Sequence, residues 1–365
     1  MNIIIFILVL GILVFIHELG HFLFAKMFGI RVDEFGFGYP PKAFTIGNFK
    51  GTDITLNWIP FGGFVKIFGE SDDGSELTEE QKKVSLIHKP RWQQFLVMFG
   101  GVLFNIVFAW ILLSGIYMSG INAPVGSAPS GYDFNETELI VSSVNQNSPA
   151  EAGGLLPGDI IVEFFSDDTQ VSVSDETIED FSNFINEQYP EDENIGLVVL
   201  RDESLEIINL TPEEGIIEGK YAVGVSAERM GELKLSFFNA FYYGALNTIG
   251  FIKNIAIGFW DLITGSISAD NVSGPVGIVK QVGDASKVGF QYLIGFTAIL
   301  SLNLAVLNLV PFPALDGGRI LIIFVESILR RRLNPKVINA INGIGFIVLI
   351  GLMLLVTFND ITKLL

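Results

Sequence analysis

The sequence predicts a polytopic α-helical membrane protein with about four transmembrane helices, a membrane-associated β-hairpin or sheet, and one inserted α+β domain. Three observations predict this class. Half of the 365 residues are hydrophobic and only 17% are charged, which gives a mean hydropathy of +0.50 and is unlike the composition of a soluble enzyme. Long apolar segments without charges occur near both ends of the chain. A strongly acidic segment separates them.

Three of the apolar segments are long enough, and free enough of charge, to cross a hydrocarbon core of about 30 Å as helices. They are residues 95–120, 288–310 and 337–358. A fourth segment, residues 2–26, is apolar as far as Ile16 and carries ionisable side chains after it. Because no basic residue precedes this apolar run and no small-residue cleavage site follows it, we interpret the segment as a spanning helix rather than a cleaved signal peptide.

The segment between residues 121 and 234 has the composition of a soluble domain. It contains 24 acidic and four basic residues, so the rest of the chain is nearly neutral although the whole carries a formal charge of −18. This acidic balance argues against a nucleic-acid partner, because phosphate binding requires a basic surface. The predicted parts are a first membrane half at 1–120 with a β region at 30–70, the inserted domain at 121–234, interfacial amphipathic helices at 235–287, and a second membrane half at 288–365.

Basic residues in the short loops predict the orientation. Residues 26–91 contain nine Lys and Arg, and residues 319–336 contain five, so both loops are placed in the cytoplasm. With four spans, both termini and the acidic domain then lie outside it. The apolar segment 235–265 is interrupted by Lys253 and Asp261. A fifth crossing there would put the two basic loops on opposite faces, so we interpret the segment as an interfacial helix.

A β-hairpin is predicted between the first two spanning helices. Apolar residues alternate on both sides of a turn at residues 47–53, which is the pattern of two paired strands. Aromatic residues follow the second strand, so we expect the sheet to rest in the cytoplasmic headgroup region. The alternating residues are Phe44 and Ile46 before the turn, and Ile54, Leu56 and Trp58 after it.

Two of the three histidines lie in the first spanning helix, in the sequence His17-Glu18-Leu19-Gly20-His21. Helical positions i and i+4 share a face, so both imidazoles can reach one divalent metal while the intervening glutamate deprotonates a water molecule. The five-residue pattern alone also arises by chance. Inside a membrane, however, two histidines and a glutamate cost several kcal/mol, which disfavours a purely structural role.

A catalytic zinc site needs a third protein ligand and an open position. The chain has no cysteine, so the third ligand is expected to be a carboxylate at membrane depth. Asp316 is the candidate, because it follows the third span in a stretch where Pro311, Pro313 and two glycines must break the helix. Irregular backbone is tolerated in a membrane only where protein or water satisfies it. An ordinary turn at a helix end is the alternative.

The remaining polar residues of the membrane segments receive weaker interpretations. Asn105 and Asn303 lie within spans, and we interpret them as hydrogen-bonding partners between helices rather than as site residues. The third histidine, His88, stands in a charged stretch and is interpreted as an interfacial residue.

Five motifs together resemble those of bacterial site-2 proteases, the zinc intramembrane metalloproteases of the regulator of sigma E protease type. The motifs are His17–His21, Phe35–Gly38, Pro60–Glu70, Ser273–Ile278 and the Asn308–Gly318 stretch that contains Leu-Asp-Gly-Gly. The resemblance covers essentially the whole chain in the same order. It implies one Zn²⁺ per chain, held by His17, His21 and Asp316, with Glu18 as the catalytic base. It also implies that Asn308, Gly36, Gly38, Ile54 and Leu56 contact the substrate.

Residues 147–161 of the inserted domain are similar to the signature of PDZ domains found in proteases. PDZ domains bind peptides by adding a strand to a sheet edge. The alternative is a PDZ-like fold that binds no peptide and only obstructs substrates with bulky ectodomains. The segment has room for a single domain of ordinary size, whereas well-known members of the family carry two.

The resemblance implies a zinc-dependent intramembrane endopeptidase in a bacterial inner membrane, with its active site toward the cytoplasm and its PDZ domain outside. Its substrates would be single-pass membrane proteins, cut after a first protease has acted, such as anti-sigma factors, or remnants of signal peptides. Two other classes stay open. One is a non-proteolytic zinc-binding or PDZ scaffold. The other is a cation-coupled transporter that uses the broken helix near Asp316.

Overall fold

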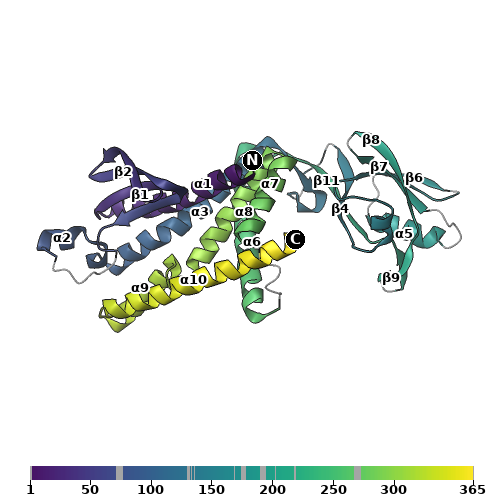
Figure 1. Ribbon diagram of the computed structural model, residues 1–365. Coiled ribbons are helices and arrows are strands. Elements are labelled where there is room, and N and C mark those ends of the chain that lie inside the picture. Colours follow the sequence, from purple (N-terminus) through teal and green to yellow (C-terminus); the bar gives the residue numbers. More distant parts are fainter. Residues whose placement is uncertain are drawn as a thin grey trace. The chain divides into compact units, whose positions relative to one another are not determined.

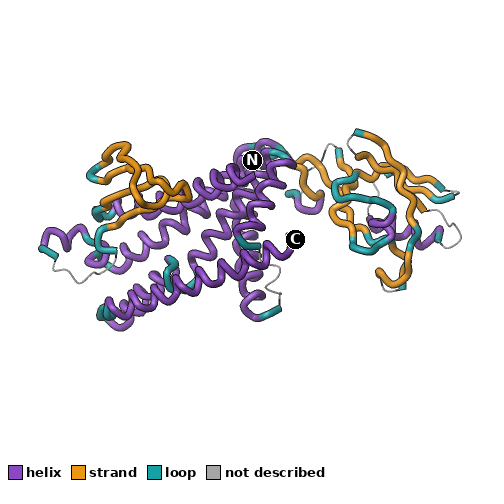
Figure 2. The backbone as a smooth tube through the Cα atoms, viewed as in Figure 1, coloured by secondary structure: helices purple, strands orange, loops and turns teal. Residues whose placement is uncertain are grey.

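The chain forms two compact units in the computed structural model (Figure 1). Unit 1 comprises Met1–Ile116 and Phe237–Leu365, and unit 2 comprises Tyr117–Ser236. Unit 1 is mainly helical, and unit 2 is mainly strands (Figure 2). The structure describes residues 2–70, 77–129, 132, 134, 136–167, 169–173, 178–189, 195–201, 203–217, 219–266 and 273–364.

Four helices of the described chain are long and apolar enough to cross a membrane. They are α1 (Asn2–Met27), α3 (Arg91–Ser119), α8 (Phe290–Leu309) and α10 (Pro335–Leu364). These helices cover the four segments predicted as spans, and their ends differ from the predicted ends by at most six residues. Large apolar side chains remain exposed on their surfaces, and in a protein of this composition such surfaces face lipid.

The other helices of unit 1 are shorter or less apolar. They are α2 (Glu79–Val84), the 3₁₀ helix η1 (Leu86–His88), α6 (Phe237–Thr264), α7 (Pro275–Val288) and α9 (Asp316–Leu329). Helix α6 covers the segment with Lys253 and Asp261, and it is not one of the four membrane-crossing candidates. It packs on α3, where the Trp110 indole donates to the Phe241 carbonyl at 2.8 Å. Its placement at the membrane interface stays a prediction.

Helix α7 packs against both the first and the last helix of unit 1. It contacts α1, α8 and α10, and its N-terminal turn is the Ser273–Ile278 motif. The buried Asp360 carboxylate of α10 accepts the Gly274 amide at 3.0 Å and the Gly277 amide at 2.7 Å. A carboxylate at this end of a helix satisfies amides that have no partner within the helix, so this motif fastens α10 to the rest of the unit.

The predicted hairpin is present and is longer than expected. Strand β1 (Val32–Phe49) and strand β2 (Thr52–Ile67) are joined at Lys50 and Gly51, whose φ angles are 47° and 78°. Both strands bend, so residues 34–37 pair on two sides, with 53–56 and with 63–66. The first part of β1 is therefore interior, and the later parts of both strands form the edges.

The inner face of this sheet packs on α1. Its buried apolar cluster includes Phe22 and Ala25 of α1, Val32 and Phe35 of β1, and Ile67 of β2. Phe15 of α1 also stacks on Phe37, with ring centroids 4.7 Å apart. Because α1 carries the two histidines, these contacts fix the hairpin beside the candidate site.

Unit 2 is built on a seven-stranded sheet with the order β3-β11-β4-β5-β7-β8, in which β6 also pairs with β5. A two-stranded sheet of β9 and β10 accompanies it. One core of buried apolar side chains, including Phe164, Phe181 and Leu197, joins the large sheet to α5. The strands are β3 (Ile121–Pro124), β4 (Thr137–Val144), β5 (Ile160–Phe165), β6 (Gln170–Ser172), β7 (Ile195–Arg201), β8 (Ser204–Leu210), β9 (Glu213–Ile217), β10 (Lys220–Ala222) and β11 (Val225–Leu233). The helices are η2 (Val125–Ser127), α4 (Pro149–Ala152) and α5 (Ile178–Gln188).

A buried ion pair anchors the loop before β5. Arg201 donates to both carboxylate oxygens of Asp159, at 2.7 and 2.6 Å. The Leu156 amide donates to the same carboxylate at 2.8 Å. Burial acts to raise the pKa of Asp159, but these hydrogen bonds outweigh it and hold the pKa below its ordinary value. A lowered pKa means that ionised Asp159 stabilises the fold.

We expect Arg201→Leu to lower the free energy of unfolding of unit 2 by about 3 kcal/mol at neutral pH, because it leaves a buried carboxylate unpaired. In the wild type this contribution is complete above about pH 4, the unfolded pKa of aspartate. It disappears as the pH falls through the lower native pKa. Urea unfolding of the purified chain, followed by hydrogen exchange in peptides of unit 2, measures both effects. Lys220→Leu, at an exposed lysine of β10, is the control. Equal stability of the two variants would contradict the expectation.

Candidate active site

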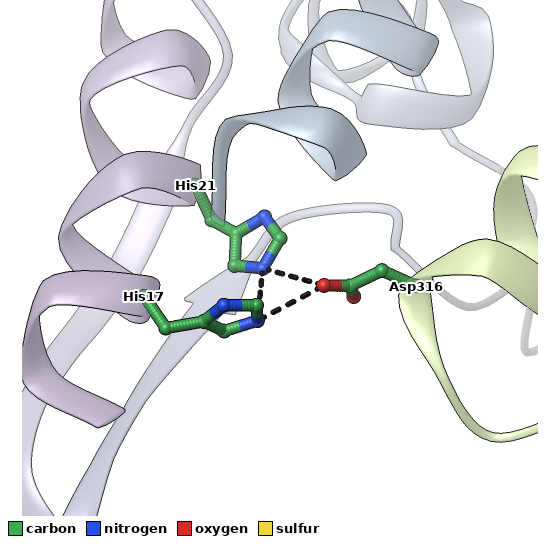
Figure 3. A group of neighbouring side chains, drawn as sticks. All are labelled: His17, His21 and Asp316. Carbon is green, nitrogen blue, oxygen red and sulfur yellow. Dashed lines mark hydrogen bonds and ion pairs between the residues drawn. The ribbon is translucent and has the colours of Figure 1, made fainter. Parts of the chain in front are cut away.

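The two histidines of the HExxH motif share one buried face of α1. Their side chains come from successive turns, and the exposed fractions of His17 and His21 are 7% and 5%. Their Nε2 atoms lie 3.2 Å apart. The Oδ2 atom of Asp316 lies 2.9 Å from His17 Nε2 and 3.3 Å from His21 Nε2 (Figure 3). The structure thus brings together the three residues that the sequence predicts as metal ligands.

A short irregular loop delivers Asp316 to the histidines. Helix α8 ends at Leu309 and α9 begins at Asp316, so the predicted break in the helix is present. The two prolines lie in this loop. The two glycines lie just after it, in the first turn of α9. A Cβ at Gly317 would collide with the carbonyls of Leu309 and Val310, and one at Gly318 with that of Phe312. Glycine is therefore needed so that the loop can fold back over this helix end.

Ion pairs hold the start of α9 in place. Arg319, three residues after Asp316, contacts Glu70 at the end of the hairpin at 3.0 Å. Glu326, one of the few buried carboxylates, contacts Arg91 at the start of α3 at 2.5 Å and accepts the Leu333 amide at 2.9 Å. The helix that carries the third candidate ligand is thus tied both to the hairpin and to α3.

The donor set fits a zinc ion. Two imidazole nitrogens and one carboxylate oxygen are the protein ligands of many catalytic zinc sites, which leave a fourth position open. Donors about 2.0–2.1 Å from a tetrahedral zinc lie about 3.3–3.4 Å from one another, close to the separations of 2.9, 3.2 and 3.3 Å between these atoms. Asp316 Oδ2 is also buried, and its only polar neighbours among the described residues are the two imidazole Nε2 atoms. An acceptor left in that state suits a metal better than a hydrogen-bonded core.

Glu18 lies on the side of α1 that faces the hairpin. A Cβ at Gly63 of β2 would be 3.8 Å from Glu18 Cγ and 3.8 Å from the Phe15 Cα. The amide of Val65, also in β2, is directed at the Glu18 carboxylate. The glutamate between the two histidines therefore stands between the candidate metal ligands and the last part of β2.

The predicted substrate-contacting residues are spread over two places. Ile54 pairs with Phe35 and Gly47, Leu56 pairs with Phe37 and Phe44, and Gly36 pairs with Thr55 and Phe64. A Cβ at Gly38 would meet the Ile59 carbonyl at 2.5 Å. Gly36, Ile54 and Leu56 are thus paired on both sides, and their backbones have no room for an added strand. Asn308 lies near the end of α8, partly exposed. Contact of all five residues with substrate stays a prediction.

Sequence reasoning missed the part of α3 that faces the histidines. Gly20 packs on Gly100, where a Cβ on either residue would collide with the backbone of the other. A Cβ at Gly101 would lie 2.5 Å from His21 Nε2 and 2.8 Å from His17 Nε2. Small residues in a spanning segment indicate close helix packing, and the Gly-Gly pair is visible in the sequence. Its partner is not, because the sequence does not say which spans are neighbours.

A buried HExxH helix, a converging carboxylate and four helices fit to cross a membrane define a metal-dependent hydrolase among membrane helices. The profile of peptidase family M50 matches residues 5–352, and the chain therefore belongs to peptidase family M50. The resemblance to site-2 proteases is thereby confirmed. The chain is a multi-pass membrane metalloendopeptidase of the zinc-dependent type.

Curated relatives match over nearly the whole chain. A protein of Clostridium perfringens (strain 13 / Type A), whose name describes a zinc metalloprotease, is 35% identical over 99% of this chain and 98% of its own length. A protein of Clostridium acetobutylicum with a name of the same kind is 32% identical over 99% of this chain and 97% of its own length. The regulator of sigma-W protease RasP of Bacillus subtilis (strain 168) is 28% identical over 100% of this chain and 99% of its own length.

Proposed function

We propose that this protein cuts peptide bonds in transmembrane segments of single-pass membrane proteins, with His17, His21 and Asp316 holding the zinc and Glu18 as the catalytic base. The convergence of the three donor atoms within 3.3 Å of one another, on helices suited to a membrane, carries this proposal. The two alternatives, a scaffold without proteolysis and a cation-coupled transporter, do not use a glutamate beside the donor group.

The division of labour follows from the positions of the side chains. When bound, zinc lowers the pKa of a water molecule and polarises the scissile carbonyl. Glu18, between the donor group and β2, takes the proton of the attacking water and passes it to the leaving amine. The buried histidines and Asp316 keep the reacting groups away from bulk water, which strengthens each electrostatic interaction there.

We place the substrate backbone along the last part of β2. A helix must unwind before its peptide bonds can be reached, and an extended chain can then pair with a sheet edge. Residues 63–67 form an edge of the hairpin sheet and run past Glu18. Gly36, Gly38, Ile54 and Leu56 support this edge from the interior of the sheet, while Asn308 borders the site from α8.

Unit 2 contains a groove suited to peptide binding, as proposed for a PDZ domain. A cavity of about 600 Å³ lies between α5 and β11, lined by Phe181, Ser182 and Ile185 on one side and by residues 225–228 on the other. Strand β3 pairs with β11 only from Met230 onward, so residues 225–228 offer a strand edge beside the groove within the described sheet. A peptide added there would be held by backbone hydrogen bonds and by an apolar pocket. The competing role, obstruction of bulky ectodomains, needs no occupant.

The basic loops support a bacterial inner-membrane orientation with the site toward the cytoplasm and unit 2 outside. With unit 2 outside, a substrate trimmed by a first protease would be accepted and an intact one refused. Anti-sigma factors and remnants of signal peptides are the proposed substrate classes. The name of RasP, a regulator of sigma-W protease, supports the first of them.

The proposal is tested with purified protein and a single-pass reporter that has a short ectodomain. We expect cleavage within the transmembrane segment, mapped by mass spectrometry. A zinc chelator should reduce it by at least about 100-fold, since the metal supplies several kcal/mol of transition-state stabilisation. Re-added zinc should restore it. Cleavage that continues at the same rate after zinc removal would overturn the proposal, and so would a cut confined to residues outside the membrane.

A further inference from the structure

Asn105 of α3 touches the candidate metal site from behind His17. Its side chain is completely buried, and its Nδ2 atom lies 3.2 Å from His17 Nδ1. Asn105 Oδ1 is buried without a hydrogen-bond partner among the described residues. Asn105 follows Gly101 by one helical turn, so both lie on the same face of α3. Gly101 leaves room for the two imidazoles, and Asn105 makes a polar contact with His17.

Each of the two histidines needs a hydrogen-bond acceptor for its Nδ1 proton if it is to bind a metal. The Nε2 atom of each faces Asp316, so a metal there would take Nε2, and the ring proton must sit on Nδ1. An Nδ1 proton needs an acceptor. For His21 the acceptor is the carbonyl of Val97, 2.8 Å from Nδ1. For His17 the group at Nδ1 is the amide of Asn105.

The amide has two orientations that differ by exchanging its oxygen and its nitrogen. With Nδ2 toward His17, two donors would face each other once the Nδ1 proton is in place, and Oδ1 stays without a donor. With Oδ1 toward His17, the amide accepts the Nδ1 proton, as the Val97 carbonyl does for His21. The exchange gives Oδ1 a hydrogen bond in the orientation that also suits metal binding, and it moves Nδ2 to the position that Oδ1 leaves.

We infer that Asn105 is a positioning residue for zinc, which accepts the hydrogen bond of His17 Nδ1 and thereby holds Nε2 unprotonated and directed at the metal. The inference rests on the proposed function in one respect, the assignment of His17 as a ligand. Interactions of this kind fix the tautomer and ring orientation of metal-binding histidines. The earlier interpretation of Asn105 as a partner between helices is extended, because the helix partner is the ligand itself.

The backbone of the same residue is held by a second helix. The hydroxyl of Ser301 on α8 donates to the Asn105 carbonyl at 2.9 Å, and both residues are completely buried. Helix α8 leads directly into the loop that carries Asp316. Asn105 therefore lies at the contact between α3, which packs beside His17, and α8, which precedes the loop that ends at Asp316.

The test is zinc affinity of the full-length protein in detergent, measured by competition with a chromogenic chelator. We expect Asn105→Leu, which removes the acceptor at similar volume, to weaken zinc binding by about 10- to 100-fold. Asn105→Asp keeps an acceptor oxygen and should stay within about three-fold of wild type, because carboxylates commonly accept this hydrogen bond. Asn303→Leu is the matched control, since Asn303 donates only to Ile299 of its own helix among the described contacts.

Two results would overturn the inference: unchanged affinity in Asn105→Leu, or equal loss in the leucine and aspartate variants, which would indicate packing rather than an accepted hydrogen bond. A positioning role alone predicts weaker zinc binding by Asn105→Leu together with nearly wild-type zinc binding by Asn105→Asp. A separate variant, His17→Ala, keeps the two proposals apart. Wild-type zinc affinity in His17→Ala would overturn the ligand assignment itself.

Discussion

Replacing Glu18 with glutamine is expected to abolish cleavage while zinc stays bound. Glutamine keeps the size and shape of the side chain but cannot take a proton from water. General-base catalysis contributes about 10²- to 10⁴-fold, and we expect a loss of at least about 10³-fold in the rate of reporter cleavage. Zinc should stay near one per chain, because Glu18 is not one of the three converging donors.

The experiment pairs reporter cleavage with zinc quantification in the same preparations. Glu80→Gln is a suitable control, since Glu80 is an exposed glutamate of α2 in the same unit. Cleavage by Glu18→Gln at the wild-type rate would remove Glu18 from the mechanism. Loss of zinc together with activity would instead make Glu18 a part of the metal site.

The substitution Gly101→Ala is expected to weaken zinc binding strongly. The alanine Cβ would lie 2.5 Å from His21 Nε2, 2.7 Å from His17 Cε1 and 2.8 Å from His17 Nε2. Ordinary carbon contacts are about 3.5–4.0 Å, and moving α1 away from α3 would break the close Gly20–Gly100 packing. The imidazoles must therefore turn away. We expect zinc binding to weaken by about 100-fold or more, beyond the usual cost of an outer-shell change.

Gly115→Ala in the same helix is the matched control. Outside the backbone of its own helix, no described atom lies within 4 Å of a Cβ at Gly115, and both substitutions have the same intrinsic effect on helix propensity. Zinc affinity and thermal unfolding of the two variants separate loss of metal from loss of fold. If Gly101→Ala bound zinc as tightly as Gly115→Ala, the close approach of α3 to the histidines would be wrong.

The sequence predicts the helices well because their signal is local. Long apolar runs place the ends of α1, α3, α8 and α10 to within six residues, since a membrane demands both length and hydrophobicity. The HExxH spacing likewise needs only the pitch of one helix. The carboxylate of Asp316 and the helix-breaking prolines before it indicate the third ligand, although about 300 residues separate it from the histidines.

The sequence does not predict which helices and strands contact one another. Alternation in the hairpin predicts two paired strands but does not reveal that residues 34–37 pair on both sides, which moves the open edge to 63–67. The roles of Gly101 and Asn105 depend on which helix lies behind His17. That choice is set by tertiary packing, and a single chain carries no local signal for it.

The wide separation of Asp316 from His17 and His21 also bears on how the protein is made. At about 5–20 residues per second, the ribosome reaches residue 316 roughly a quarter of a minute to a minute after it has completed the HExxH helix. Until then the nascent chain holds only two of the three converging donors. The complete group of three protein donors therefore forms only when the chain is nearly finished.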